Sequence, residues 1–179
     1  MGHHETHSAG RMPEHDDVAV VPVPPKPGEW ARRFTIASDA VARDLPHVRV
    51  EHIGSTAVPD LPAKDVVDVL VGTPPGGVRH AASLLVDECF DRESTRDHHC
   101  WLAWPNRSTR AVVVHVVELD SPSWTRRLAF RDLLRRDPEA RHRYLEVKRE
   151  AAVPGDGWAH YTQRKAAIVA RLLDGVDCD

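Results

Sequence analysis

Two features of the sequence have residue types that could bind or transform a phosphate-containing molecule. The first is the small-residue turn Gly54-Ser55-Thr56. Its exposed backbone N–H groups and two hydroxyls would suit a phosphate group. The spacing of a Walker motif is absent, so the turn is not a P-loop. On this pattern alone the turn is weak evidence for a phosphate site, because most such turns only change the direction of the chain.

The second feature is Asp68, which interrupts the apolar run at residues 66–71. A carboxylate in a buried strand must be paired, hydrogen-bonded or bound to a cation, because burying it alone is costly. An ion pair with a nearby arginine and a functional carboxylate are both open interpretations. Asp65 lies an odd number of residues away, so strand alternation places it on the opposite face.

Histidines next to these features are candidates for proton transfer or metal binding. His115 lies in a strand-like run at residues 112–117, and it takes such a role only if it faces Asp68. A buried neutral histidine with a structural hydrogen bond is the alternative, and the same holds for His52. Residues 98–100, His-His-Cys, have the types of a zinc site. Adjacent residues rarely supply three ligands to one ion, so we expect no site there.

The spacing of apolar residues predicts the elements that position these groups. Steps of three and four residues indicate helices at 28–45 and 78–89, and helices that begin near 121, 137 and 158. Alternating or continuous apolar runs indicate strands at 48–53, 66–71, 100–104 and 110–117, with a short edge strand at 18–23. This order predicts an α/β (α+β) front half followed by a helical C-terminal half.

The composition is that of one ordinary globular domain. The chain has 179 residues and a net charge of −3, which argues against a dedicated nucleic-acid binder. No apolar run approaches membrane length, so we expect a cytoplasmic protein without a membrane partner. We expect residues 1–17 to be a disordered polar tail, residues 18–174 to form a single domain, and residues 175–179 to be a short tail.

A longer pattern resembles the signature of the GrpB-like proteins. It consists of His52-Ile53-Gly54-Ser55-Thr56-Ala57-Val58-Pro59, then Leu61, Ala63-Lys64 and Val67-Asp68-Val69. Later residues that agree in order include Arg110 with the His115 strand, Tyr144 with Lys148, and Tyr161 with Lys165. The family belongs to the DNA polymerase beta-like nucleotidyltransferase superfamily. The resemblance therefore implies a mixed β-sheet flanked by helices, with the Gly-Ser turn near nucleotide phosphates.

The resemblance also implies a site, with two departures from the superfamily pattern. Asp68 matches the first aspartate of a metal-binding D-x-D pair, but the second position is Leu70, and the His115 strand stands where a third carboxylate is expected. We expect Asp68 and His115 to be catalytic and to hold a divalent metal, with Lys64 as a further catalytic residue. One aspartate and one histidine anchor at most a single ion, and imidazole suits manganese or zinc better than magnesium. The residues expected to bind a nucleoside triphosphate are His52, Gly54, Ser55, Thr56, Arg110, Lys148 and Lys165.

Three functions stay open on this evidence. The first is an enzyme that transfers a nucleotidyl or similar activated phosphate group to a small acceptor. The second is a protein that binds a nucleotide or phosphometabolite but has lost metal-dependent chemistry, as Leu70 suggests. The third is a different one-metal reaction of specialised metabolism on the same fold. Fold-level analogy favours the first over the second, and the second over the third.

Overall fold

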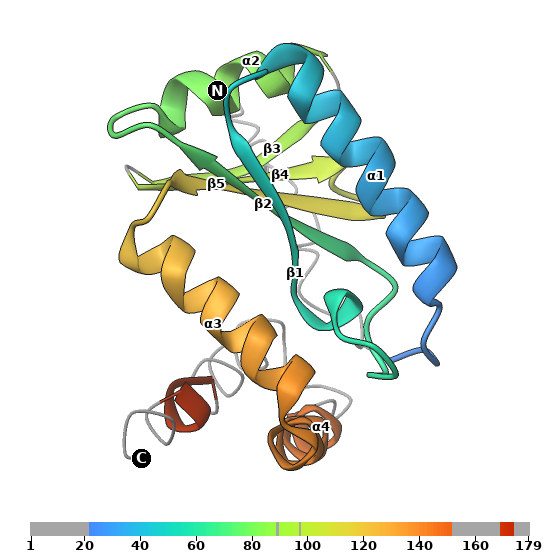
Figure 1. Ribbon diagram of the computed structural model, residues 1–179. Coiled ribbons are helices and arrows are strands. Elements are labelled where there is room, and N and C mark those ends of the chain that lie inside the picture. Colours follow the sequence, from blue (N-terminus) through green and yellow to red (C-terminus); the bar gives the residue numbers. More distant parts are fainter. Residues whose placement is uncertain (1–21, 89, 97, 152–168, 174–179) are drawn as a thin grey trace, which may run out of the picture.

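The computed structural model describes residues 22–88, 90–96, 98–151 and 169–173, and in these residues helices flank one sheet (Figure 1). The strands are β1 (Arg49–Ile53), β2 (Val67–Thr73), β3 (Asp91–Arg96), β4 (His99–Trp104) and β5 (Val112–Glu118). The helices are α1 (Pro27–Asp44), the short 3₁₀ helix η2 (Ser55–Ala57), α2 (Val78–Glu88), α3 (Pro122–Arg136) and α4 (Pro138–Ala151). The predicted fold class, a mixed sheet flanked by helices, is confirmed.

The strands lie side by side in the order β1-β2-β5-β4-β3. The central pair, β2 and β5, is parallel, and the other pairs are antiparallel. In the central pair Asp68 lies beside Val113, and Leu70 lies beside His115. Side chains that are neighbours across a sheet point to the same face, and every second residue of a strand does so too. Asp68 and His115 therefore face the same side of the sheet.

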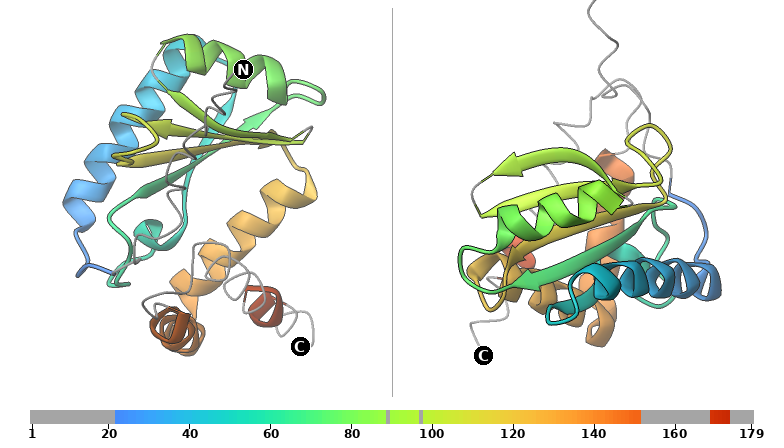
Figure 2. Two further views of the ribbon diagram at one scale, coloured as in Figure 1. Left: turned by 180° about the vertical axis from the view of Figure 1, so that it is seen from behind. Right: turned by 90° about the horizontal axis from the view of Figure 1, so that it is seen from above.

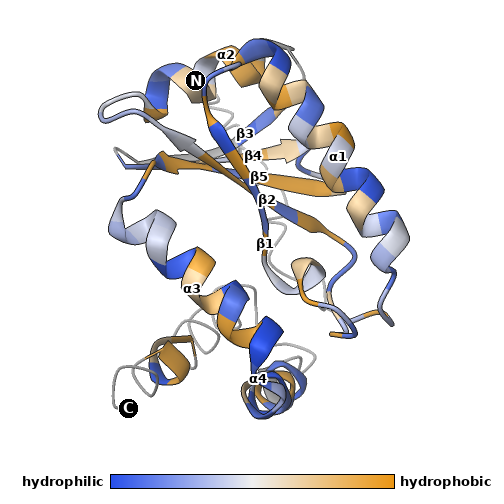
Figure 3. Ribbon diagram, viewed as in Figure 1, coloured by the Kyte–Doolittle hydropathy of each residue, from blue (hydrophilic) through white to orange (hydrophobic). Residues whose placement is uncertain are grey.

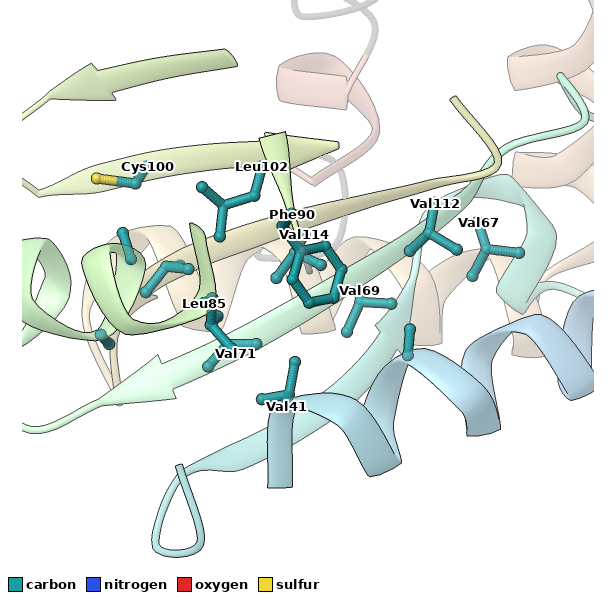
Figure 4. Close-up of a cluster of buried hydrophobic side chains, with 14 of the residues drawn as sticks. Val41, Val67, Val69, Val71, Leu85, Phe90, Cys100, Leu102, Val112 and Val114 are labelled. Carbon is teal, nitrogen blue, oxygen red and sulfur yellow. The ribbon is translucent and has the colours of Figure 1, made fainter. Parts of the chain in front are cut away.

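The other face of the sheet is apolar and packs against α1 and α2 (Figure 2). Valines at alternate positions of β2 and β5 point into this layer, and Val41 and Leu85 meet them from the two helices (Figure 4). All of these side chains are fully buried. Each buried valine or leucine contributes about 1.5–3 kcal/mol relative to an exposed one, so this layer supplies most of the driving force for folding.

The face that carries Asp68 packs against α3 and has a smaller apolar cluster. The cluster consists of Ile53, Leu70, Val117 and Trp124. Gly72 of β2 makes room for it, because a Cβ there would lie 2.8 Å from the Trp124 ring. Along most of its length β5 is hydrophobic, whereas α3 mixes hydrophilic and hydrophobic positions (Figure 3). Polar side chains can therefore lie between α3 and the sheet.

The C-terminal helices hold the turn that follows β1. Val58 and Leu61, just after η2, pack with Leu134 of α3 and Tyr144 of α4 in a separate buried cluster. The predicted start of α3 is confirmed, since the Ser121 hydroxyl accepts the Trp124 N–H at 3.3 Å. The turn is thus packed against the helical half at one side and joined to the sheet at the other.

Several details differ from the sequence prediction. Strand β3 was not predicted, because its sequence Asp-Arg-Glu-Ser-Thr-Arg has no apolar alternation; as the edge strand it pairs only with β4. The expected edge strand at 18–23 reduces, in the residues described, to a bridge between Val23 and Ala63. The two tails and most of the helix expected from residue 158 lie outside the described residues, although 169–173 are helical. No described helix is long and apolar enough to cross a bilayer.

Candidate functional site

The turn after β1 brings the backbone close to the Asp68 carboxylate. Gly54 has φ 72° and ψ −171°, a conformation that only glycine adopts readily. A Cβ on Gly54 would overlap Oδ2 of Asp68 and lie 3.0 Å from its Cγ. Both the backbone conformation and the close approach require glycine here. The carboxylate and the predicted phosphate turn therefore lie against each other.

A buried lysine from α4 reaches the same turn. Lys148 is only 4% exposed, and its Nζ donates to the Pro62 carbonyl at 2.9 Å and to the Ser55 hydroxyl at 3.3 Å. The Tyr144 hydroxyl lies 3.4 Å from the same Ser55 oxygen, and the Tyr144 ring lies 5.5 Å from Nζ. The contact between the predicted residues Ser55 and Lys148 spans 93 positions of the sequence.

His52 and Thr56 support the turn from the α1 side. Nε2 of His52 lies 3.0 Å from the buried Thr56 hydroxyl, and its ring stacks on Phe34 of α1 with centroids 4.9 Å apart. Burial lowers the pKa of His52 to about 4, helped by the nearby Arg135 and Arg131 and opposed by Asp68. His52 is therefore neutral at physiological pH.

His115 and Asp68 meet on the α3 side of the sheet, as the sequence hypothesis required. His115 Nε2 lies 3.3 Å from Oδ1 of Asp68, and the two side chains are 15% and 30% exposed. The pair is thus partly open to solvent rather than sealed in the core. A separation of 3.3 Å suits a long hydrogen bond, and two ligands of one small cation have similar spacing.

Two residues that were not among the predicted site residues complete this group. Nε2 of His99, on β4, lies 3.1 Å from Nδ1 of His115, and Nη2 of Arg127, on α3, lies 3.3 Å from Nδ1 of His99. Burial lowers the pKa of Arg127, while the negative charge of Asp68 raises it. His99 also packs on Trp101, with ring centroids 3.6 Å apart. In the sequence, His99 stands two residues before Trp101, and this spacing places both side chains on the same face of a strand.

Two of the remaining predicted residues lie at the start of the parallel strand pair. Lys64 is half-buried in the loop before β2, and its carbonyl accepts the Val66 N–H at 2.7 Å. Arg110 is half-buried just before β5, at the same end of the parallel pair. Lys165 lies outside the described residues. From α3, Arg135 donates to the carbonyl of Ala57 at 2.9 Å and so fixes the end of η2.

Comparison with known proteins decides the family. The family model described as GrpB protein matches residues 18–174. The chain belongs to the GrpB family. The UPF0157 protein of Deinococcus radiodurans is 41% identical over 172 residues, which are 96% of this chain and 89% of that protein. The UPF0157 protein of Pseudomonas aeruginosa is 35% identical, over 88% of this chain and 67% of that protein.

Solved structures agree with this assignment. The crystal structure of GrpB from Enterococcus faecalis matches with a TM-score of 0.71 and 26% identity, covering 87% of this chain and 99% of that one. A chain of the GLD-2/RNP-8 complex matches with a TM-score of 0.55 and 11% identity, over 87% of this chain and 62% of that one. Cid1 poly(U) polymerase with bound MgGTP matches with a TM-score of 0.52 and 15% identity, over 73% of this chain and 44% of that one. The last two show a nucleotidyltransferase-like fold for this GrpB protein.

The residues of this GrpB site do not fit the two-metal centre that such a fold implies. Two ions require several carboxylates to offset their charge and fix their positions. Leu70, in the second aspartate position, is fully buried beside His115, and Val113 lies beside Asp68. Within the described ranges, no three histidine, cysteine, aspartate or glutamate side chains lie where they could share a metal ion. A two-metal mechanism therefore does not suit the described residues of this site.

Proposed function

We propose that this GrpB-family protein is an enzyme that transfers a nucleotidyl or related phosphate-containing group to a small acceptor. The observation that carries the proposal is the contact between Gly54 and Asp68, which puts a carboxylate against a phosphate-type turn. The nucleotidyltransferase-like fold supports the same class of reaction by analogy.

The turn and Lys148 would hold the phosphate groups of the substrate. The Ser55 hydroxyl offers a hydrogen bond, and the ammonium group of Lys148, 3.3 Å away, offers positive charge. Because Lys148 is buried, its charge is weakly screened and acts strongly on an anion at the turn. The expected substrate is therefore a nucleotide or a phosphorylated small molecule.

Asp68 would act as the general base of the transfer. The acceptor oxygen attacks the α-phosphorus of a nucleoside triphosphate, and its proton passes to the Asp68 carboxylate. The new P–O bond forms as the bond to pyrophosphate breaks, and pyrophosphate leaves with the bonding electrons. His115 orients the carboxylate through the contact at 3.3 Å.

A second candidate is a binding protein without turnover. The specific observation in its favour is the buried Leu70 in place of a second carboxylate. This protein would hold the same phosphorylated ligand at Ser55 and Lys148, but it would not transform it. The two candidates differ only in the fate of the bound ligand, so one pair of measurements separates them.

The first measurement is calorimetric titration with inorganic tripolyphosphate and with a panel of nucleoside triphosphates. Lys148→Met should weaken binding at least about tenfold, or about 1.4 kcal/mol, because it removes the charge at the turn. Arg143→Met is the matched control on the same helix, where Arg143 pairs with the exposed Glu139 at 3.2 Å and should leave binding unchanged. Equal affinities in the two variants would contradict a phosphate site at this turn.

The second measurement is pyrophosphate release from a nucleotide that binds, with a panel of small hydroxyl acceptors. Transfer by the proposed enzyme should depend on Asp68, so that Asp68→Asn binds the nucleotide but loses turnover by at least about a hundredfold. Binding without pyrophosphate release by the wild type would favour the second candidate. Full turnover by Asp68→Asn would rule out the role given to this residue.

A further inference from the structure

Four polar side chains from four different elements form a row on the α3 side of the sheet. They are Arg127 of α3, His99 of β4, His115 of β5 and Asp68 of β2. The contacts join Arg127 Nη2 to His99 Nδ1 at 3.3 Å, His99 Nε2 to His115 Nδ1 at 3.1 Å, and His115 Nε2 to Asp68 Oδ1 at 3.3 Å. The row begins at a guanidinium and ends at a carboxylate, and both ring nitrogens of each histidine have a neighbour in it.

The charged group at each end restricts where the histidine protons lie. A guanidinium only donates hydrogen bonds, so Nδ1 of His99 must accept and cannot carry a proton. The proton of neutral His99 is then on Nε2, which donates to Nδ1 of His115. The proton of His115 is therefore on its Nε2, facing the acceptor oxygen of Asp68. Both ends of the row require the same direction of donation.

We infer that Arg127 and His99 fix the tautomer of His115, so that His115 donates its Nε2–H to Asp68 instead of offering a lone pair to a metal ion. The opposite tautomer would put a proton on Nδ1 of His115. His99 would then have to accept through Nε2 and carry its proton on Nδ1, opposite the N–H of Arg127. Two donors would face each other at 3.3 Å, which opposes this arrangement.

The assignment gives His99 and Arg127 a role as positioning residues. They act on Asp68 through His115, and they keep the pair Asp68–His115 a hydrogen-bonded dyad. Oδ1 of Asp68 takes the His115 N–H, while Oδ2 faces Gly54 and the turn. Only the statement that Asp68 meets the substrate rests on the proposed function. The tautomer assignment is a property of the protein without ligand.

His99 is needed because the contact to Asp68 is long. At 3.3 Å the hydrogen bond from His115 is weak, so Asp68 alone gives only a modest preference for one tautomer. The shorter contact at 3.1 Å supplies a donor at Nδ1 and adds to this preference. Trp101 holds the His99 ring in place by packing against it.

The test is a long-range proton–nitrogen correlation spectrum of the isotope-labelled full chain at neutral pH without ligand. The His115 signals are assigned with the His115→Gln variant. In the wild type, we expect Nε2 of both His99 and His115 to be protonated, and both Nδ1 atoms to show the shift of an unprotonated nitrogen. A proton on Nδ1 of either residue, or on both nitrogens of one ring, would overturn the inference.

Two substitutions of His99 test whether it sets the tautomer of His115. His99→Phe keeps an aromatic ring on Trp101 but removes the donor, so the His115 shifts should move toward a mixture of tautomers. In His99→Gln, the amide accepts from Arg127 and donates to His115, so the wild-type shifts should return. Wild-type shifts in His99→Phe would contradict the role of His99. Because no ligand is present, these results are independent of whether a nucleotide binds.

Arg127→Leu makes the same comparison at the other end of the row, and it replaces His99→Phe if that variant does not fold. Without the guanidinium, His99 should lose its preference for a proton on Nε2. Arg126→Leu removes an equal charge from the exposed neighbouring position and should leave both histidines as in the wild type. Equal spectra of the two arginine variants would contradict the role of Arg127.

Discussion

Two aspartates three residues apart face opposite sides of the sheet and differ in almost every physical respect. Asp65 accepts hydrogen bonds from Lys26 at 2.8 Å, Trp30 at 2.9 Å and Arg33 at 2.8 Å, all on or next to α1. Burial raises its pKa, but these three donors outweigh burial and hold it at about 2. Asp65 is thus a fixed anchor that joins α1 to the start of β2.

Asp68 lies against a turn instead of a helix. Its Oδ1 receives an N–H from His115 at 3.3 Å, and its Oδ2 lies where Gly54 would otherwise carry a side chain. The backbone of Gly54 is held in a conformation that costs free energy for other residues. The comparison teaches that charge and local sequence do not separate a structural from a functional carboxylate; the groups that surround each one do.

The largest expected effect concerns Gly54. Gly54→Ala should destabilise the fold by about 1–3 kcal/mol and abolish binding of a phosphorylated ligand, since the new Cβ displaces Asp68. Gly76→Ala is the matched control, because Gly76 also has a positive φ of 74° but has open space around it. Chemical denaturation and calorimetric titration check the two variants. If both glycine variants bind the ligand equally well, the close approach of Asp68 to the turn has no functional meaning.

The second prediction separates the two aspartates directly. Asp65→Asn should lower the free energy of unfolding by about 2 kcal/mol, since its pKa of about 2 lies below the ordinary value of 3.8. Asp68→Asn should lower the free energy of unfolding by less than half of that amount, because the amide oxygen of asparagine still accepts a hydrogen bond from His115. Urea unfolding measures both.

The contribution of Asp65 to the stability of the fold should depend on pH. A lowered pKa in the folded state stabilises the fold above the unfolded pKa, and the contribution is lost as the pH falls from about 4 to about 2. Asp65→Asn should therefore lose part of this acid sensitivity. An equal acid sensitivity in Asp65→Asn and the wild type would contradict the anchoring role.

At mildly acidic pH a smaller effect is expected for His52, another group on the α1 side whose pKa is shifted. Its folded-state pKa of about 4 lies below the ordinary 6.5, so the unfolded chain takes up a proton first as the pH falls. Stability should therefore decrease between pH 6.5 and 4, by about 1.4 kcal/mol at pH 5.5. His52→Gln removes the titrating ring, so it should flatten this part of the stability profile. An unchanged slope would show that His52 is not the group responsible.

The fold and part of the site could be predicted from the sequence, because their signals are local. The odd separation of Asp65 and Asp68 predicts that they lie on different sides of the sheet, although Asp65 precedes β2, and apolar periodicity reveals α1 and the helical half. Ser55 and Lys148 were each expected to bind the nucleotide, but no pattern in the sequence predicts that they contact one another. The geometry of this contact depends on how α4 packs against residues 58–61, which no local pattern specifies.

The row of polar groups could not be predicted in full, for two physical reasons. His99 reaches His115 only through the pairing of β4 with β5, and the apolar run of β5 does not reveal which of its faces is polar. Arg127 depends on the rotation of α3 about its axis, and arginines lie on several sides of that helix. We did not expect a zinc site at the three adjacent residues His98-His99-Cys100, and no pattern in them predicts that His99 contacts His115 on another strand.

The most direct test of the account is a proton–nitrogen chemical-shift map of the full chain titrated with inorganic tripolyphosphate. We expect saturable shifts at the amides of Gly54, Ser55 and Thr56, with none at Asp65 or along α1, and loss of these shifts in Lys148→Met. Shifts scattered over exposed lysines and arginines, or shifts at the turn that survive in Lys148→Met, would contradict a phosphate site beside Asp68.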